Sequence, residues 1–185
     1  SIHTCLDALA MIRNENDLQG DDFATIEAAV STPTYVHCAW PYHAQSITAA
    51  QMNIYYCLAV MALDGEAFVK QFNDDRIADP AIFKLIKRIT ARIDPDIDAL
   101  GPAHRHTAKL SVTTTDGRHL EKQISLRKGS PENPLSDDEV ITKFHALTAG
   151  RLTPERQRRV IDYVNHLEDQ SDVRDLINIM LLASS

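Results

Sequence analysis

Residues 129–144 read GSPENPLSDDEVITKF, a turn that runs directly into the start of a helix. Pro131 and Pro134 fix the backbone φ angle and exclude helix up to this point. Ser136 and Glu139 have the spacing of a capping box, in which each side chain accepts a hydrogen bond from the other residue's backbone N–H. The stretch therefore predicts a rigid loop followed by a helix that begins just after Ser136.

Downstream of this loop the pattern is helical to the end of the chain. We expect three helices: Asp137–Ala149 ended by Gly150, Pro154–Glu168 capped by Thr153, and Asp172–Leu182 capped by Ser171 or Asp172.

Upstream of the loop, the Asp116-Gly117 pair predicts a β-hairpin between residues 108–112 and 120–126. A two-residue loop would put the apolar side chains of the two strands on opposite faces of the sheet. A three-residue loop pairs Val112 with Leu120 and puts both apolar sets on one face. We therefore expect the longer loop, with Gly117 in a left-handed conformation.

The first half of the chain mixes helices with one strand region. The first expected element is a helix with the apolar residues Cys5, Leu6, Leu9 and Ile12, followed by strand over most of Phe23–Cys38. A buried helix is expected from a Thr48–Gln51 capping box to about Asp64. A short helix over Glu66–Phe72 and a helix from Asp79-Pro80 that includes Ile89 follow it. Strands that cluster between groups of helices predict an α+β fold, an antiparallel sheet covered by helices, as a single domain over residues 1–185.

Composition excludes several classes of protein. A formal net charge of -7 and a pI near 5.5 argue against a nucleic-acid binder. The apolar run Cys57–Leu63 is too short to span a membrane, and the first residues do not have the basic and then apolar pattern of a signal peptide. The three cysteines show neither disulfide nor metal spacing. We expect a soluble cytoplasmic protein with no metal site.

The clearest candidates for catalysis are His3 and Asp7, which are spaced i, i+4 on one helix face. A carboxylate at this spacing can orient the imidazole for proton transfer near neutral pH. The alternative is an ordinary surface ion pair. A second candidate is Tyr56, a phenol on a buried helix that needs a hydrogen-bond partner, either a substrate or a backbone carbonyl. A third is the cationic segment His104-Arg105-His106, whose alternative interpretation is a solvent-exposed edge.

The order of residues 129–144 resembles the stretch near the C-terminus of the MmgE/PrpD family, which includes 2-methylcitrate dehydratases and cis-aconitate decarboxylases. The segment SIHTCLDA, residues 1–8, resembles the helix on which this family carries a His followed by an Asp. The segment AQMNIYYCLA, residues 50–59, is similar to a family helix whose active-site tyrosine matches Tyr56. Met52, Asn53 and Tyr55 depart from the usual family residues.

The resemblance implies that the chain is the C-terminal domain of a lyase whose larger N-terminal helical domain is absent here. It implies a cofactor-independent, homodimeric enzyme that moves a proton next to a carboxylate of a small di- or tricarboxylate. On this basis His3 and Tyr56 are the predicted catalytic residues, and Asp7, Asn53 and Arg105 are predicted to bind or orient the substrate.

Dehydration of 2-methylcitrate, a step of propionate catabolism, is the first choice that the resemblance suggests. Decarboxylation of cis-aconitate and an epimerase reaction of the iminodisuccinate type are the alternatives within the family. An alternative of another class is a non-catalytic module that binds carboxylates or a partner chain.

Overall fold

The computed structural model describes residues 1–181, which divide into two compact units with the boundary after Pro134. Each unit is described here by itself.

The first unit is built on a four-stranded sheet with the order β2-β1-β3-β4. The strands are β1 (Phe23–Val30), β2 (Ile89–Ile93), β3 (Ala108–Thr114) and β4 (His119–Ile124). The pairs β1–β3 and β3–β4 are antiparallel, as expected, but β1 and β2 are parallel. The α+β class is therefore confirmed, and the sheet is mixed instead of wholly antiparallel.

The β3–β4 hairpin has the predicted register. Val112 pairs with Leu120 across the two strands, and Ala108 pairs with Ile124. Gly117 has a φ of 88° and its N–H donates to the carbonyl of Thr114. The three-residue loop wins over the two-residue loop because it alone places Leu110, Val112 and Leu120 on the face that packs into the core.

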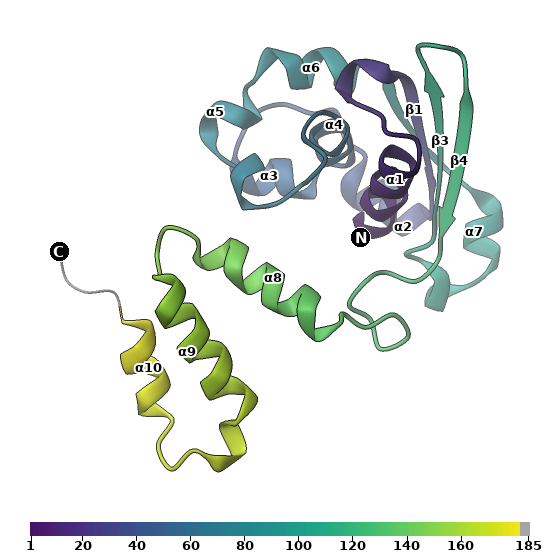
Figure 1. Cartoon of the computed structure of the whole chain (residues 1–185). Coiled ribbons are helices and arrows are strands. Elements are labelled where there is room, and N and C mark those ends of the chain that lie inside the picture. The colour runs from purple at the N-terminus through teal and green to yellow at the C-terminus, as the bar shows by residue number, and fades with distance from the viewer. Residues whose placement is uncertain (182–185) are drawn as a thin grey trace. The chain divides into compact units, whose positions relative to one another are not determined.

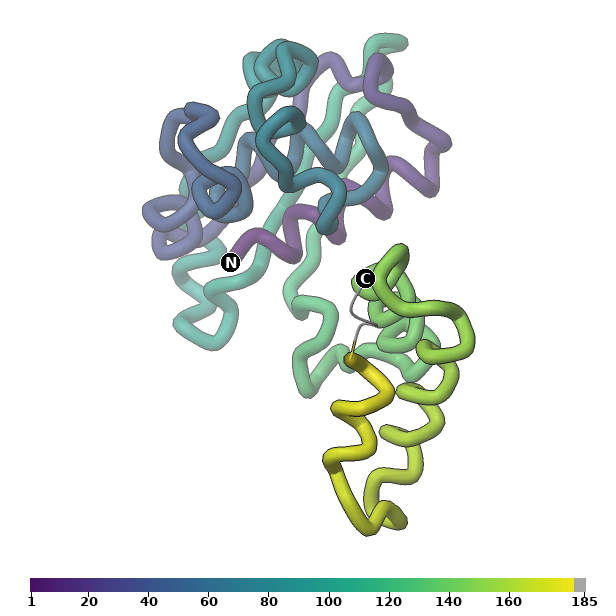
Figure 2. Tube along the Cα trace, turned by 90° about the vertical axis from the view of Figure 1, so that its left-hand side faces the viewer, coloured from purple at the N-terminus to yellow at the C-terminus, as the bar shows by residue number. Residues whose placement is uncertain are grey.

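Two helices cover that face of the sheet (Figure 1). Helix α1 (His3–Glu15) packs on β3 and β4, and its purple tube runs beside the green trace of the hairpin in Figure 2. Helix α4 (Ile54–Asp64) packs on β2 and against α1. All residues of α4 from Tyr56 to Ala62 are buried, so the prediction of a central helix without a polar face is confirmed.

The prediction of strand through Cys38 was wrong beyond Val30. Residues 32–38 form helix α2 (Thr32–Cys38). Ser31 caps it by accepting from the N–H of Thr34, and Pro33 stands in its first turn, where a missing N–H costs nothing. These local signals override the strand preference of the β-branched and aromatic residues in this stretch.

The single helix expected from Thr48 to Asp64 is two helices, α3 (Ile47–Met52) and α4. The cap of α3 is Ser46 instead of Thr48. Asn53 interrupts the helix with an extended backbone and caps α4, because its side chain accepts from the N–H groups of Tyr55 and Tyr56. The end of α4 at the left-handed Gly65 is as predicted.

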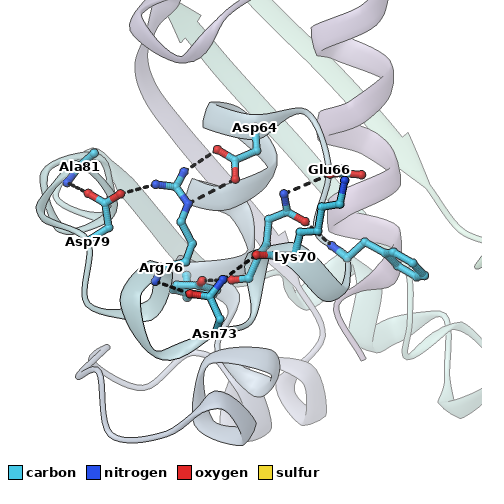
Figure 3. Close-up of polar contacts among 10 residues, drawn as sticks. Asp64, Glu66, Lys70, Asn73, Arg76, Asp79 and Ala81 are labelled. Carbon is cyan, nitrogen blue, oxygen red and sulfur yellow. Dashed lines mark hydrogen bonds and ion pairs between the residues drawn. The ribbon is translucent and has the colours of Figure 1, made fainter. Parts of the chain in front are cut away.

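After α4 the chain forms a short 3-10 turn (Val69–Gln71) within the predicted helix over residues 66–72, then α5 (Asp74–Ile77), α6 (Pro80–Ile86) and, beyond β2, α7 (Pro95–Ala99). Asp79 caps α6 as expected, but Ile89 begins β2 and is not helical. Figure 3 shows how the Arg76 guanidinium joins Asp64 at the end of α4 to Asp79.

The second unit consists of α8 (Asp137–Thr148), α9 (Pro154–Asn165) and α10 (Arg174–Met180) within the described residues. The capping box of Ser136 and Glu139 and the Thr153 cap are confirmed. Tyr163 fastens α9 to the start of α10 by donating to the carbonyl of Asp172 at 2.7 Å. The predicted end of the last helix at Leu182 lies outside the described residues.

Candidate functional site

The first turn of α1 carries His3 and Asp7 on one face. His3 is exposed and Asp7 is half-buried. Burial raises the pKa of the Asp7 carboxyl, while the backbone N–H of Lys128, the charge of His3 and the charge of Lys128 all oppose this rise. The electrostatic interaction between His3 and Asp7 expected from their spacing is therefore present. The Asp7 carboxylate also accepts a hydrogen bond from the backbone of Lys128, in the loop after β4.

His106 faces the same end of α1. The hydroxyl of Thr4 donates to the backbone carbonyl of His106, which ties the loop before β3 to the first turn of α1. Burial lowers the pKa of the His106 imidazole, and the positive charges of Arg105, the N-terminal amino group, Arg127 and His3 lower it further. The structure thus brings His3 and Arg105 close to His106, and Asp7 close to His3, within the first unit.

Tyr56 lies in the core. Its side chain is fully buried between Tyr42 and Phe72, with ring centroids 5.1 Å and 5.6 Å away. Its hydroxyl donates to the backbone carbonyl of Gln71, and burial raises the phenol pKa well above its usual range. This contact is the structural alternative considered for Tyr56 from the sequence, and its catalytic role stays a prediction.

Asn53 is also fully buried, and every polar atom of its side chain is engaged. The oxygen accepts from the two N–H groups at the start of α4, and the amide nitrogen donates to the carbonyl of Trp40 at 2.8 Å. A structural role as a helix cap accounts for all of these contacts. Orientation of the substrate by Asn53 stays a prediction.

The three cysteines share the core cluster with these residues. Burial raises the thiol pKa of Cys5 and of Cys57 to about 12. At neutral pH both thiols are protonated and therefore poor nucleophiles. Among residues 1–181, no three His, Cys, Asp or Glu side chains cluster in a way that could hold a metal ion.

The sequence analysis missed two contributors to this region, Arg127 and Lys128. Both directly precede the Gly129–Pro134 loop, and both are exposed. A basic pair directly before the residue 129–134 loop was a sequence feature that could have identified them as candidate site residues. His106 was seen only as part of an exposed cationic segment, because sequence alone does not show that α1 packs beside the start of β3.

No helix in the described part of the chain is long and apolar enough to cross a membrane.

Comparison with known proteins finds several curated relatives. A cis-aconitate decarboxylase-like protein of Aspergillus oryzae is 28% identical over 157 residues, which cover 84% of this chain and 32% of the relative. A cis-aconitate decarboxylase of Aspergillus terreus is 25% identical over 160 residues, covering 84% of this chain and 32% of the relative. The human cis-aconitate decarboxylase is 26% identical over 185 residues, covering 97% of this chain and 37% of that enzyme.

The chain spans about a third of the length of these curated relatives. The family model of the MmgE/PrpD C-terminal domain matches residues 1–169, across both compact units. The loop before α8, the His3 helix and the Tyr56 helix all lie inside this match. The chain therefore belongs to the MmgE/PrpD family.

Proposed function

We propose that this chain supplies one half of the active site of a lyase that acts on a small di- or tricarboxylate. The observation that carries the proposal is the first turn of α1, where exposed His3 stands four residues before a carboxylate that the Lys128 backbone holds in place. A proton-transfer group needs this kind of orientation, and a negatively charged substrate needs the positive charges that lie around it.

The chemistry explains the residue types. When a bond beside a carboxylate breaks and its electron pair stays on carbon, negative charge builds up at that carbon. An imidazole can deliver or remove the proton there, and Asp7 stabilises its charged form. His3 is the proposed proton-transfer group, and Asp7 is its positioning residue.

Two reactions of the family remain as candidates. The relatives described above favour loss of CO2 from cis-aconitate, since each carries the name of that decarboxylase or of a protein like it. The dehydration of 2-methylcitrate shares the same carbanion-like centre and is the second candidate. In both cases the remainder of the site is proposed to come from a helical domain, which the relatives' greater length accommodates.

The test is an assay of the complete gene product in which residues 1–185 occur. We expect it to release CO2 from cis-aconitate, followed as gas evolution, or to convert 2-methylcitrate, followed by proton NMR. The purified 185-residue chain should turn over neither, because half of the contacts are missing. Failure of the complete product on both substrates would favour the non-catalytic, carboxylate-binding module, and steady turnover by the chain alone would refute the divided site.

A further inference from the structure

The loop before β3 is held rigidly at two consecutive carbonyls. The carbonyl of Arg105 accepts from the hydroxyls of Ser31 at 2.6 Å and Thr34 at 3.1 Å. The carbonyl of His106 accepts from the hydroxyl of Thr4. These three hydroxyl residues are all at least 97% buried and belong to α1 and to the start of α2. The backbone that carries the Arg105 and His106 side chains is therefore fixed by the core.

The two side chains interact directly. The Nε of Arg105 lies 3.1 Å from the Nε2 of His106. A guanidinium donates hydrogen bonds and never accepts them, so Nε2 of His106 is the acceptor. The neutral imidazole then carries its proton on Nδ1. Arg105 thus fixes the tautomer of His106 and leaves one N–H donor for another group.

A third member comes from a distant part of the chain. Arg127 lies between β4 and α8, and its charge acts both on His106 and on Glu132. The charges that act on the His106 imidazole, those of Arg105, Arg127, His3 and the N-terminal amino group, are all positive. The carboxylates of this region lie beside other groups, Asp7 at Lys128, Glu132 at Arg127 and Asp98 in a pocket with Arg105. The whole chain has a net charge of -7, so the positive surroundings of this imidazole run against the general sign of the molecule.

We propose that Arg105, His106 and Arg127 form a carboxylate-binding subsite beside His3, which holds one carboxylate of a di- or tricarboxylate while His3 acts at a neighbouring carbon. Arg127 and the Nδ1–H of His106 are the donors to the anion. Arg105 is a positioning residue, because it fixes the imidazole. The inference rests on the proposed function for the identity of the substrate, but binding of the anion is measurable without turnover.

Binding and protonation at this subsite are coupled. An anion beside His106 favours the charged imidazolium, so it must raise the pKa that the surrounding positive charges lower. The charged groups that act on the imidazole are His3 of α1, Arg105 of its own loop, Arg127 after β4, and the N-terminal amino group. A tricarboxylate should therefore shift the titration of His106 upward, and a monocarboxylate should do so much less.

The experiment is a pH titration of the histidine Cε1–H signals of the 185-residue chain by NMR, with citrate, acetate or chloride at equal ionic strength. His106→Gln assigns the signal. We expect citrate to raise the titration midpoint of His106 saturably, and acetate to have little effect. Arg127→Gln should weaken the citrate response by about tenfold, since it removes a charge-assisted hydrogen bond to the anion.

Arg118→Gln is the matched control. Arg118 is an exposed arginine at the hairpin turn, paired with Asp116 at 3.0 Å, and its replacement should leave the citrate response unchanged. A citrate response equal to that of chloride, or equal in Arg127→Gln and Arg118→Gln, would overturn the subsite.

The two proposals fail in different ways. If citrate binds as described but the complete gene product turns over no di- or tricarboxylate, the proposed function falls and the subsite stands. If the complete product is active and Arg127→Gln leaves KM within twofold of the parent value, the subsite falls and the function stands. The subsite requires Arg127→Gln to raise KM by about tenfold with a smaller change in kcat.

Discussion

Tyr56 of α4 donates its phenolic hydrogen bond to the backbone carbonyl of Gln71, in the 3-10 turn that follows the helix. Gln71 is itself held by its own side chain, which donates to Glu66 at 3.1 Å and accepts from the N–H of Phe68 at 3.1 Å. The hydroxyl therefore ties the central helix to a turn that is already ordered.

The first prediction follows from this contact. Tyr56→Phe removes only the hydroxyl and leaves a buried carbonyl without its partner, so the free energy of unfolding should fall by about 1–2 kcal/mol. Urea unfolding measures it. Tyr42→Phe is the matched control, because the Tyr42 hydroxyl also donates a buried hydrogen bond to a backbone carbonyl, that of Ile77 at 2.7 Å. This substitution should lower the free energy of unfolding by a similar amount. Unchanged stability with turnover reduced tenfold in the complete gene product would instead place the Tyr56 hydroxyl in the chemistry.

The second prediction concerns His3. In the complete gene product, His3→Ala should lower kcat by about 10²-fold or more, because general acid-base groups contribute on that scale. His3 is exposed, so thermal unfolding of the variant should match the parent. His43→Ala, an exposed histidine after α2, serves as the control. A kcat within threefold of the parent value would remove His3 from the mechanism.

The third prediction uses the raised pKa of Asp7. A carboxyl whose folded pKa lies above its ordinary value of 3.8 binds more protons in the folded state, so stability falls as pH rises from 3.8 through the folded pKa. Asp7→Asn keeps an acceptor for the Lys128 N–H without the charge. Its free energy of unfolding should exceed that of the parent at pH 7, and the difference should vanish below 3.8. A parent that is more stable than the variant at pH 7 would show that His3 and Lys128 outweigh burial.

The fourth prediction concerns the Arg76 network of Figure 3. Arg76 bonds Asp64 and Asp79 together, with about a fifth of its side chain exposed. Lysine offers a single charged nitrogen and cannot span two carboxylates in the same fork, so Arg76→Lys should lower the free energy of unfolding by about 1–2 kcal/mol. Arg118→Lys changes an exposed pair and should stay within about 0.5 kcal/mol. Equal effects of the two substitutions in urea unfolding would contradict the role of the network.

The fifth prediction compares two glycines with positive φ. Gly117→Ala meets open space, so only the left-handed backbone opposes it, at roughly 1–2 kcal/mol. At Gly65 the new methyl group would stand 2.6 Å from a guanidinium nitrogen of Arg13 and would displace that side chain from Gln19. Gly65→Ala should therefore destabilise the protein more than Gly117→Ala in urea unfolding. Equal effects of the two substitutions would mean that Arg13 relaxes freely, and a larger effect at Gly117 would contradict the prediction.

The sequence predicted those parts of the fold that depend on short-range patterns. The register of the hairpin follows from the alternation of apolar and polar side chains in the two strands and from Gly117 in the turn. The cap at Ser136 follows from the spacing between Ser136 and Glu139. β2 was missed because Ile89 continues the apolar pattern of α6, and its strand character comes from pairing with Ile26, a partner far away in sequence. The break at Asn53 was missed because an asparagine cap within an apolar run resembles an ordinary helical residue.

The candidate site divides in the same way. The His3–Asp7 spacing is local and was visible in the sequence. The approach of His106 and Lys128 to that turn requires α1 to lie across β3 and β4, and no short segment encodes it.

The position of β1 in the sheet has a consequence for how the chain folds. β1 is the central partner of β2 and β3, and both partners come much later in the sequence, so its two pairings each close a long loop. Only β3 and β4 can pair through a short turn. The hairpin should therefore form early and β1 should join it late, which slows folding relative to a domain with local strand pairing. During synthesis, α1 and β1 must wait until β3 has emerged before they gain the surface that covers them.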